Sequence, residues 1–208
     1  MDLDTTHLLA LAAALGWASG LRLYAVLFLT GLAGWLGWVD LPQGLRLLEN
    51  PFMLGASGFM LAVEFFADKI PGVDTLWDAV HTLIRIPAGA ALAGAVFGGD
   101  PATWTTIAAL LGGALAATSH VAKATTRAAV NTSPEPFSNI ALSLIGDAAV
   151  PAALWLASTH PVVALVAIAV ATLSMNAIVA LLMKVLRGLV ARLRGRLGGA
   201  VGHRTVEH

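Results

Sequence analysis

One uncharged run in the C-terminal third most constrains the fold of this chain. From Ala148 to Met183 the sequence contains no Lys, Arg, Asp or Glu. A helix needs about 20 residues to cross the hydrocarbon core of a bilayer, so this run can supply parts of two crossing helices. The chain is 58% hydrophobic and only 12% charged, with a mean hydropathy of +0.81, whereas soluble domains have roughly 25% charged residues. The sequence therefore predicts an integral membrane protein.

Breaks in the apolar pattern divide the 208 residues into six predicted transmembrane helices. The first apolar stretch, about 7–38, is too long for one upright span, and Ser19-Gly20 interrupts it. We expect a long, tilted or broken helix there, or a half-helix followed by a full span. The other helices are expected at about 51–69, 74–98, 103–129, 136–158 and 161–184. The predicted fold is all-α and polytopic, with breaks in the first and fourth helices.

The distribution of basic residues predicts the orientation in the membrane. With six spans, nine Lys and Arg residues fall on the side that carries both termini, and only Arg46 falls on the other side. Basic residues concentrate in cytoplasmic loops, so we expect both termini to be cytoplasmic and the protein to lie in the cell (inner) membrane. Residues 1–190 are then a single transmembrane domain, and 191–208 are a basic cytoplasmic tail.

Two segments one hundred residues apart are alike. LAAALGWAS at 11–19 and LGGALAATS at 111–119 are identical at four of nine positions. In each half, a Pro-Phe pair begins the next helix, an acid follows about three turns later, and a third helix is apolar. This pattern has two interpretations. It reflects two inverted three-helix repeats, 6–98 and 103–190, as in many transporters, or only the general likeness of helices rich in Ala, Gly and Leu.

Three blocks of the sequence are distinctive: ADKIPGVDTLWDAVHTLIRIPAGA, ASGLRLY and NTSPEPFSN. With these blocks the chain resembles, over about residues 8–185, an uncharacterised family of small bacterial integral membrane proteins that is known as a domain of unknown function. The resemblance implies the membrane class. It implies no activity, cofactor or site residue.

A polar stripe is predicted on the third helix. Asp74, Asp78, His81 and Arg85 are spaced four, three and four residues apart, which places them on one face of a helix. Either the stripe faces a cavity where protons or ions are exchanged, or the two aspartates lie at the wet helix end and only Arg85 is deep. Arg85 would lie about 16 Å along the helix from Asp74, near the middle of a ~30 Å core, and therefore needs a partner. The candidate partners are Glu64, Asp78 and Asp147.

Three acids are candidates for ion or proton binding. Glu64 and Asp68 share one face of the second helix, and two neighbouring carboxylates suit proton carriage or cation binding. Asp147 interrupts an otherwise neutral run, and an acid at the centre of a span costs roughly 2.5–3.5 kcal/mol on insertion scales. It must therefore face the interior of the bundle. The alternative for Glu64 and Asp68 is a structural ion pair with Arg22, Lys69 or Arg85. For Asp147 it is a buried pair with Arg22 or Arg85.

Four basic or imidazole side chains are candidates for an anion site. Arg22 follows Ser19-Gly20, and His120 is followed by Lys123 and Arg127. Helix-end amides together with a guanidinium form an anion site. Alternatively, Lys123 and Arg127 are anchors that extend to the lipid headgroups.

The sequence thus predicts a small transporter or channel-like permease for a small ion, a solute or a lipid phosphate. The alternatives are a lipid-modifying membrane enzyme, with His81 and Asp78 or Glu64 as acid and base, and a structural or assembly protein. An enzyme is the less favoured class, since no nucleotide-binding or hydrolase motif is present. We expect membrane lipids, an ion or anionic solute and a homodimer as partners, and no nucleic acid, metal, cofactor or catalytic residue. The candidate binding residues are Arg22, Glu64, Asp68, Asp78, His81, Arg85, His120, Lys123, Arg127 and Asp147.

Overall fold

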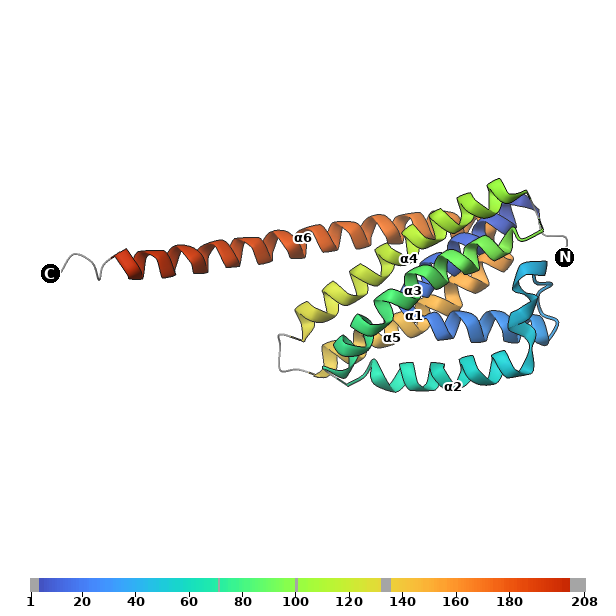
Figure 1. Ribbon diagram of the computed structural model, residues 1–208, viewed down its shortest axis with the longest axis horizontal. Helices are drawn as coiled ribbons and strands as arrows, with labels where there is room; N and C mark the ends of the chain where they lie inside the picture. Colours follow the sequence, from blue (N-terminus) through green and yellow to red (C-terminus); the bar gives the residue numbers. More distant parts are fainter. Residues whose placement is uncertain (1–3, 71, 100, 132–135, 203–208) are drawn as a thin grey trace.

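All regular structure in the described part of the chain is helical. The computed structural model describes residues 4–70, 72–99, 101–131 and 136–202. The elements, in chain order (Figure 1), are α1 (Thr5–Trp35), η1 (Gln43–Glu49), α2 (Pro51–Ala67), α3 (Val73–Val96), α4 (Ala102–Val130), α5 (Pro136–Thr159) and α6 (Pro161–Gly202). The predicted all-α fold is confirmed.

The helix starts follow the local chemistry of the sequence. A carboxylate oxygen of Asp4 accepts a hydrogen bond from the backbone amide of His7 at 2.9 Å and caps α1. Asn50 caps α2 in the same way, and Pro51 occupies the first turn. Proline is favoured there because its missing N–H would have no helical partner. Pro136 and Pro161 begin α5 and α6, as the sequence predicts.

Helix α1 is broken at Arg22, where φ is −148° and ψ is 89°. The segment before the break runs beside α4 and in the same direction. Gly16 lies against Gly112, so that an added Cβ would be 2.6 Å from the Gly112 Cα, and Gly20 lies against Ser119. Glycine is required at this crossing because any side chain would meet the neighbouring helix.

The segment after the break turns back toward the start of the helix (Figure 1). Gly31 lies against the backbone of Leu48, and Gly34 lies against the side chain of Glu49. Both contacts are with η1, which adjoins the start of α2. Helix α1 is therefore a hairpin of two helical segments with Arg22 at its tip.

The hairpin bears on the predicted placement of the two termini. That prediction needed α1 to pass once through the bundle. Because α1 returns, the start of α1 and the end of α6 lie at opposite ends of the molecule (Figure 1). The described part of the chain has five helices long and apolar enough to cross a membrane, or six if η1 and α2, bent by 71°, form one broken span.

The similarity between segments 11–19 and 111–119 has an explanation in helix packing that does not need an inverted repeat. Helix α4 is continuous over Ala102–Val130, so the break predicted in the fourth helix is absent. The similar segments 11–19 and 111–119 pack against each other and run in the same direction. Their shared small residues permit close helix packing. Parallel neighbours do not support an inverted repeat.

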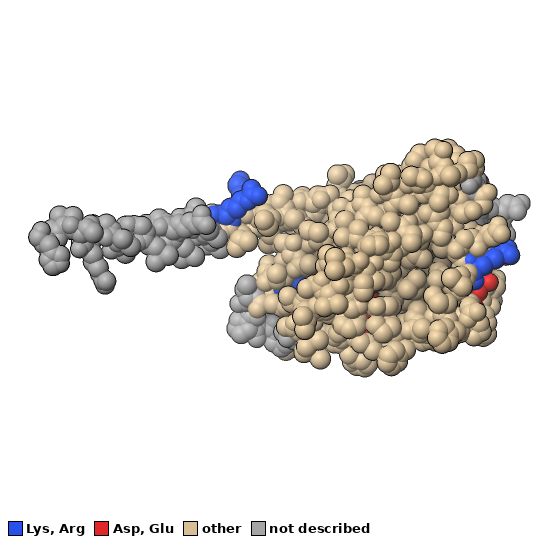
Figure 2. Space-filling view, viewed as in Figure 1, with Lys and Arg blue, Asp and Glu red and all other residues tan. Residues whose placement is uncertain are grey.

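Helix α1 lies at the centre of the bundle, and α6 lies at its edge. In the most apolar part of each helix, 78% of the α1 residues are buried, against 11% of the α6 residues. Large apolar side chains are exposed around the outside of the bundle, including Phe52, Leu83, Phe137 and Leu173. In Figure 2 the visible side of the bundle is almost uncharged, and basic side chains stand out on α6 where it leaves the bundle. Such a surface suits a lipid environment.

Helix α6 continues without a break from the bundle into the basic C-terminal segment. The predicted boundary of a separate tail at 191 thus falls inside a helix. The last residues of the predicted tail, 203–208, lie outside the described residues.

Candidate functional site

A network of ion pairs fills the interior of the bundle. In the described part of the chain it joins five basic and five acidic side chains, so it is formally neutral. The members come from α1, the end of α2, the turn after it, α3, α4 and α5. The basic members are Arg22, Lys69, Arg85, Lys123 and Arg127, and the acidic members are Glu64, Asp68, Asp74, Asp78 and Asp147.

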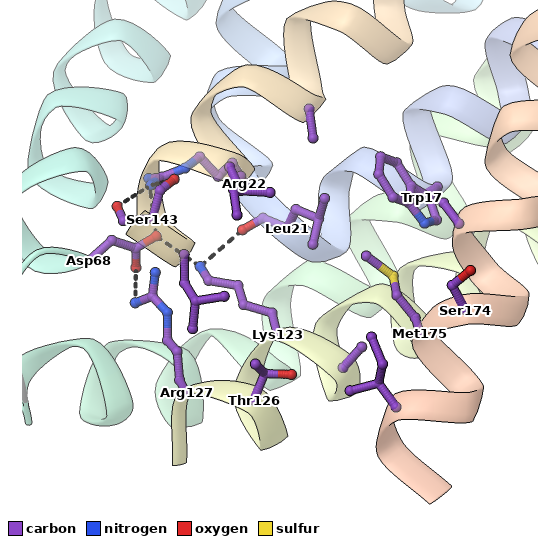
Figure 3. A pocket seen from close by; sticks show the side chains of 17 residues that line it. Trp17, Leu21, Arg22, Asp68, Lys123, Thr126, Arg127, Ser143, Ser174 and Met175 are labelled. Carbon is purple, nitrogen blue, oxygen red and sulfur yellow. Dashed lines mark hydrogen bonds and ion pairs between the residues drawn. The ribbon is translucent and has the colours of Figure 1, made fainter. Parts of the chain in front are cut away.

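Asp68 is the centre of the network. It ends α2 and is 0% exposed. Its carboxylate lies 3.0 Å from Arg22 Nη1, 2.9 Å from Lys123 Nζ and 3.0 Å from Arg127 Nη1. Figure 3 shows the three basic groups pointing toward it from α1 and α4. A single carboxylate thus faces three cations at this point.

Arg85 forms the deepest part of the network. Its guanidinium donates at 2.6 Å to Glu64 from α2 and at 2.6 Å to Asp78, seven residues earlier on α3. Arg85 and Glu64 are both 0% exposed. In surroundings of low dielectric constant each of these groups is stable only with its partner. This pair is therefore sealed from both solvent and lipid.

Arg22 joins the tip of the α1 hairpin to α5. Its Nε lies 2.7 Å from Asp147, and its Nη2 donates to the hydroxyl of Ser143 at 2.8 Å. The break in α1 also gives the backbone carbonyl of Leu21 a side-chain partner. The carbonyl of Leu21 accepts a hydrogen bond from Lys123 Nζ at 3.0 Å. Lysine commonly satisfies the last carbonyls of a helix in this way.

The two histidines have different surroundings. Nδ1 of His120 lies 3.3 Å from Arg85 Nη1, and its Nε2 lies 2.7 Å from the hydroxyl of Thr82. The ring of His81 stacks on Trp77 at 4.0 Å, and Tyr24 OH lies 3.2 Å from His81 Nε2. Nδ1 of His81 lies 2.8 Å from the backbone oxygen of Trp77. His81 thus joins none of the ion pairs among the described residues.

Most of the ten candidate binding residues predicted from the sequence lie together in the ion-pair network. Eight of the ten belong to the network, His120 touches it through Arg85, and only His81 is outside. The alternative that Asp74 and Asp78 lie at a wet helix end is wrong, because both residues are at most 2% exposed. Asp74 accepts from the amide group of Asn131.

Sequence reasoning missed two polar contributors to the site. Ser143 lies four residues before Asp147, so the two share a face of α5, and this spacing was the available signal. Lys69 appeared only as a possible partner, yet its Nζ lies 3.2 Å from Asp147. The described residues contain no group of three or more His, Asp or Glu side chains placed to hold a metal.

A first cavity of about 380 Å³ lies against this network. Its charged end consists of Arg22, Asp68, Lys123 and Arg127. Its remaining walls are mainly apolar and come from α1, α4, α5 and α6 (Figure 3). The surface that faces the cavity is therefore almost entirely apolar, and the three basic side chains and one carboxylate at its end are largely buried and paired with one another.

A second cavity of about 470 Å³ lies between α1, α2 and α5. Its walls are apolar side chains such as Leu29, Leu61 and Phe65, together with Arg22 and Asp147. In the described part of the chain Arg22 is the one residue that lines both cavities. The tip of the α1 hairpin thus lies between the two cavities.

The long apolar helices, their exposed apolar surface and the buried charges together define a multi-pass helical membrane protein. The sequence matches a protein family over residues 9–183. The chain belongs to this family, which is described as a domain of unknown function (DUF4126), and the resemblance carried by the three sequence blocks is confirmed. No curated protein and no solved structure matches the chain significantly.

Proposed function

We propose that this protein is a small transporter or channel-like permease for an anionic substrate, either a small solute or a lipid phosphate. The position of Arg22 in the walls of both cavities carries this proposal. A guanidinium is permanently charged and binds carboxylate or phosphate through two parallel hydrogen bonds. An anion that moves from one cavity to the other would pass this group.

The partners of Arg22 suggest how an anion is exchanged. Asp68 is 0% exposed and also binds Lys123 and Arg127, whereas the Asp147 side chain is 21% exposed and lines the second cavity. A substrate anion would therefore replace Asp147 at Arg22, and Lys69 would keep Asp147 paired. The positive end of the second α1 segment also lies at this position and favours negative charge.

We infer an orientation from the hairpin and the basic residues. With α1 as a re-entrant hairpin, helices α2 to α6 make five crossings. The α2–α3 turn, the end of α4 and the far end of α6 then share one side, with Lys69, Arg127 and Lys184. Arg46 lies on the opposite side, with the start of α1. The positive-inside rule makes the first side cytoplasmic, so the C-terminal end is cytoplasmic and the start of α1 is not.

Cysteine labelling tests this orientation, because the chain contains no cysteine of its own. In intact cells we expect a membrane-impermeant maleimide to label Thr5→Cys and not Arg187→Cys. After permeabilisation both variants should react. If both positions react only after permeabilisation, α1 crosses the membrane once and the hairpin does not describe the protein in its bilayer.

The transport proposal predicts a loss of flux when the charge of Arg22 is removed. Purified protein in liposomes would be assayed for uptake of radiolabelled inorganic phosphate and for movement of fluorescent phosphatidic acid between leaflets. We expect Arg22→Gln to lower the active rate about tenfold or more, as for the loss of a charge-assisted hydrogen bond. The matched control is Arg46→Gln, because Arg46 is exposed on η1 and lies outside both cavities.

A second variant separates transport from folding. Among the described residues, Arg22→Gln leaves Asp147 with Lys69 as its one ion-pair partner, so the double variant Arg22→Gln/Asp147→Asn should be the more stable protein. It should remain inactive if Arg22 handles the substrate. Recovery of flux in the double variant, or no phosphate and no lipid movement by the unmodified protein, would overturn the proposal.

The two alternative classes, a structural or assembly protein and a lipid-modifying enzyme, receive unequal support. The sealed Arg85–Glu64 pair lines neither cavity, which favours a structural role for that part of the network. An acid–base enzyme would need His81 beside a carboxylate. The partners of His81 in the described residues are instead the Trp77 carbonyl and the Tyr24 hydroxyl.

A further inference from the structure

The first cavity has the features of a binding site for one class of substrate. We infer that it binds the headgroup of an anionic phospholipid, which enters from the side of the bundle between α5 and α6. This inference rests on the proposed function and narrows its substrate to a lipid.

The charged end of the cavity is complementary to a phosphate monoester. Arg22, Lys123 and Arg127 line it together with a single carboxylate, that of Asp68. The remaining acids of the network lie outside the lining. Two guanidinium groups and one ammonium group suit a group with several acceptor oxygens. A choline headgroup would instead bring its own positive charge against these cations.

The opening of the cavity faces the membrane. Ile145 on α5 and Ile178 on α6 both line the cavity, and they are 64% and 46% exposed. Small residues of the same two helices, Gly146 and Ser174, also line the cavity. Helix α6 carries no charge before Lys184. An acyl chain can therefore leave the cavity into lipid without passing a charged side chain.

An unused hydrogen-bond donor lies in the same wall. The indole N–H of Trp17 has no partner among the described residues, and the side chain is only 6% exposed. Figure 3 shows Trp17 on the far side of the cavity from Asp68, close to Met175 and Ser174. A buried donor without a partner is unfavourable. A lipid ester oxygen near this position would satisfy it.

The volume limits how much of the lipid is enclosed. Ligand sites typically measure about 300–1,000 Å³, and this cavity is near the lower limit at about 380 Å³. The phosphate, the glycerol and the first part of the chains therefore lie inside. The ends of the acyl chains remain in the bilayer.

Native mass spectrometry of the detergent-purified protein tests this inference, with phosphatidic acid and phosphatidylcholine of identical acyl chains as probes. We expect phosphatidic acid to be retained about tenfold more strongly, the effect of one additional charge-assisted hydrogen bond. The test variant is Gly146→Leu, which fills the cavity without removing a charge. An added Cβ at Gly146 would lie 3.7 Å from Arg22 Nε, an ordinary contact. The selectivity for phosphatidic acid should disappear.

Two controls isolate the cavity. Gly55→Leu adds the same side chain to an exposed helical glycine on α2 with open space around it, and should change nothing. Lys184→Gln/Arg187→Gln removes surface charge from α6 and should also leave the selectivity intact.

Equal retention of both lipids, or selectivity unaffected by Gly146→Leu, would overturn the inference. If phosphate uptake persists without lipid selectivity, the lipid assignment fails and the transport proposal stands. The absence of any flux contradicts the transport proposal itself.

Discussion

Replacing Arg85 with leucine is expected to destabilise the folded protein by about 3–5 kcal/mol, the typical effect of breaking a buried ion pair. The loss arises mainly at Glu64, which has Arg85 as its one ion-pair partner in the described structure and is 0% exposed. Asp78 suffers less, because Lys123 lies 3.1 Å from it. The free energy of unfolding in mixed detergent micelles is the measurement.

The double variant Glu64→Leu/Arg85→Leu distinguishes the desolvation of Glu64 from the loss of packing. It removes the orphaned carboxylate, so it should recover a large part of the stability that Arg85→Leu loses. Arg85 lines neither cavity, so flux by the double variant should stay near that of the unmodified protein. A double variant no more stable than Arg85→Leu would show that the pair does not lock α2 to α3.

The second large effect is expected at the crossing of α1 and α4. Gly16→Ala would place a methyl group 2.6 Å from Gly112 Cα and 2.8 Å from its carbonyl oxygen. Both are backbone atoms, so no side chain can move aside, and we expect a loss of about 1–3 kcal/mol from overpacking. The shift should also displace the hairpin tip and therefore reduce transport.

Gly55→Ala is the matched control for this prediction. It introduces the same methyl group into α2 at a position with no neighbouring atoms. Alanine is favoured over glycine in helices by about 1 kcal/mol, so this variant should be slightly stabilised. If both variants shift the unfolding free energy in the same direction, close contact between α1 and α4 does not contribute to the fold.

Much of the helical framework follows from local sequence signals. Prolines at 51, 136 and 161 mark helix starts, and the spacing of charges on α3 places Asp78 and Arg85 on one buried face. Deep burial of Glu64 and Arg85 is also predictable, because each interrupts apolar sequence and must find a partner. These properties depend on residues close together in the chain.

The reversal of α1 and the role of Asp68 do not follow from such signals. Helical periodicity tells which face of a segment is buried, but it does not tell the direction in which the next segment runs. Arg22 is flanked by apolar residues on both sides, so the break has little local signature beyond Ser19-Gly20. Asp68 lies at a helix end next to Lys69, a position typical of exposed residues. Its burial depends on cations from α1 and α4, which the sequence places far away.

The formal neutrality of the network has a consequence for the assembly of the protein during synthesis. Arg22 is made long before Asp147, and Asp68 is made long before Lys123 and Arg127. An arginine at the tip of a hairpin is unfavourable in lipid until its acids arrive. The α1 hairpin is therefore expected to reach its final depth only after α5 has entered the membrane. The N-terminal segment of this protein would therefore be among the last parts to reach its final position in the membrane.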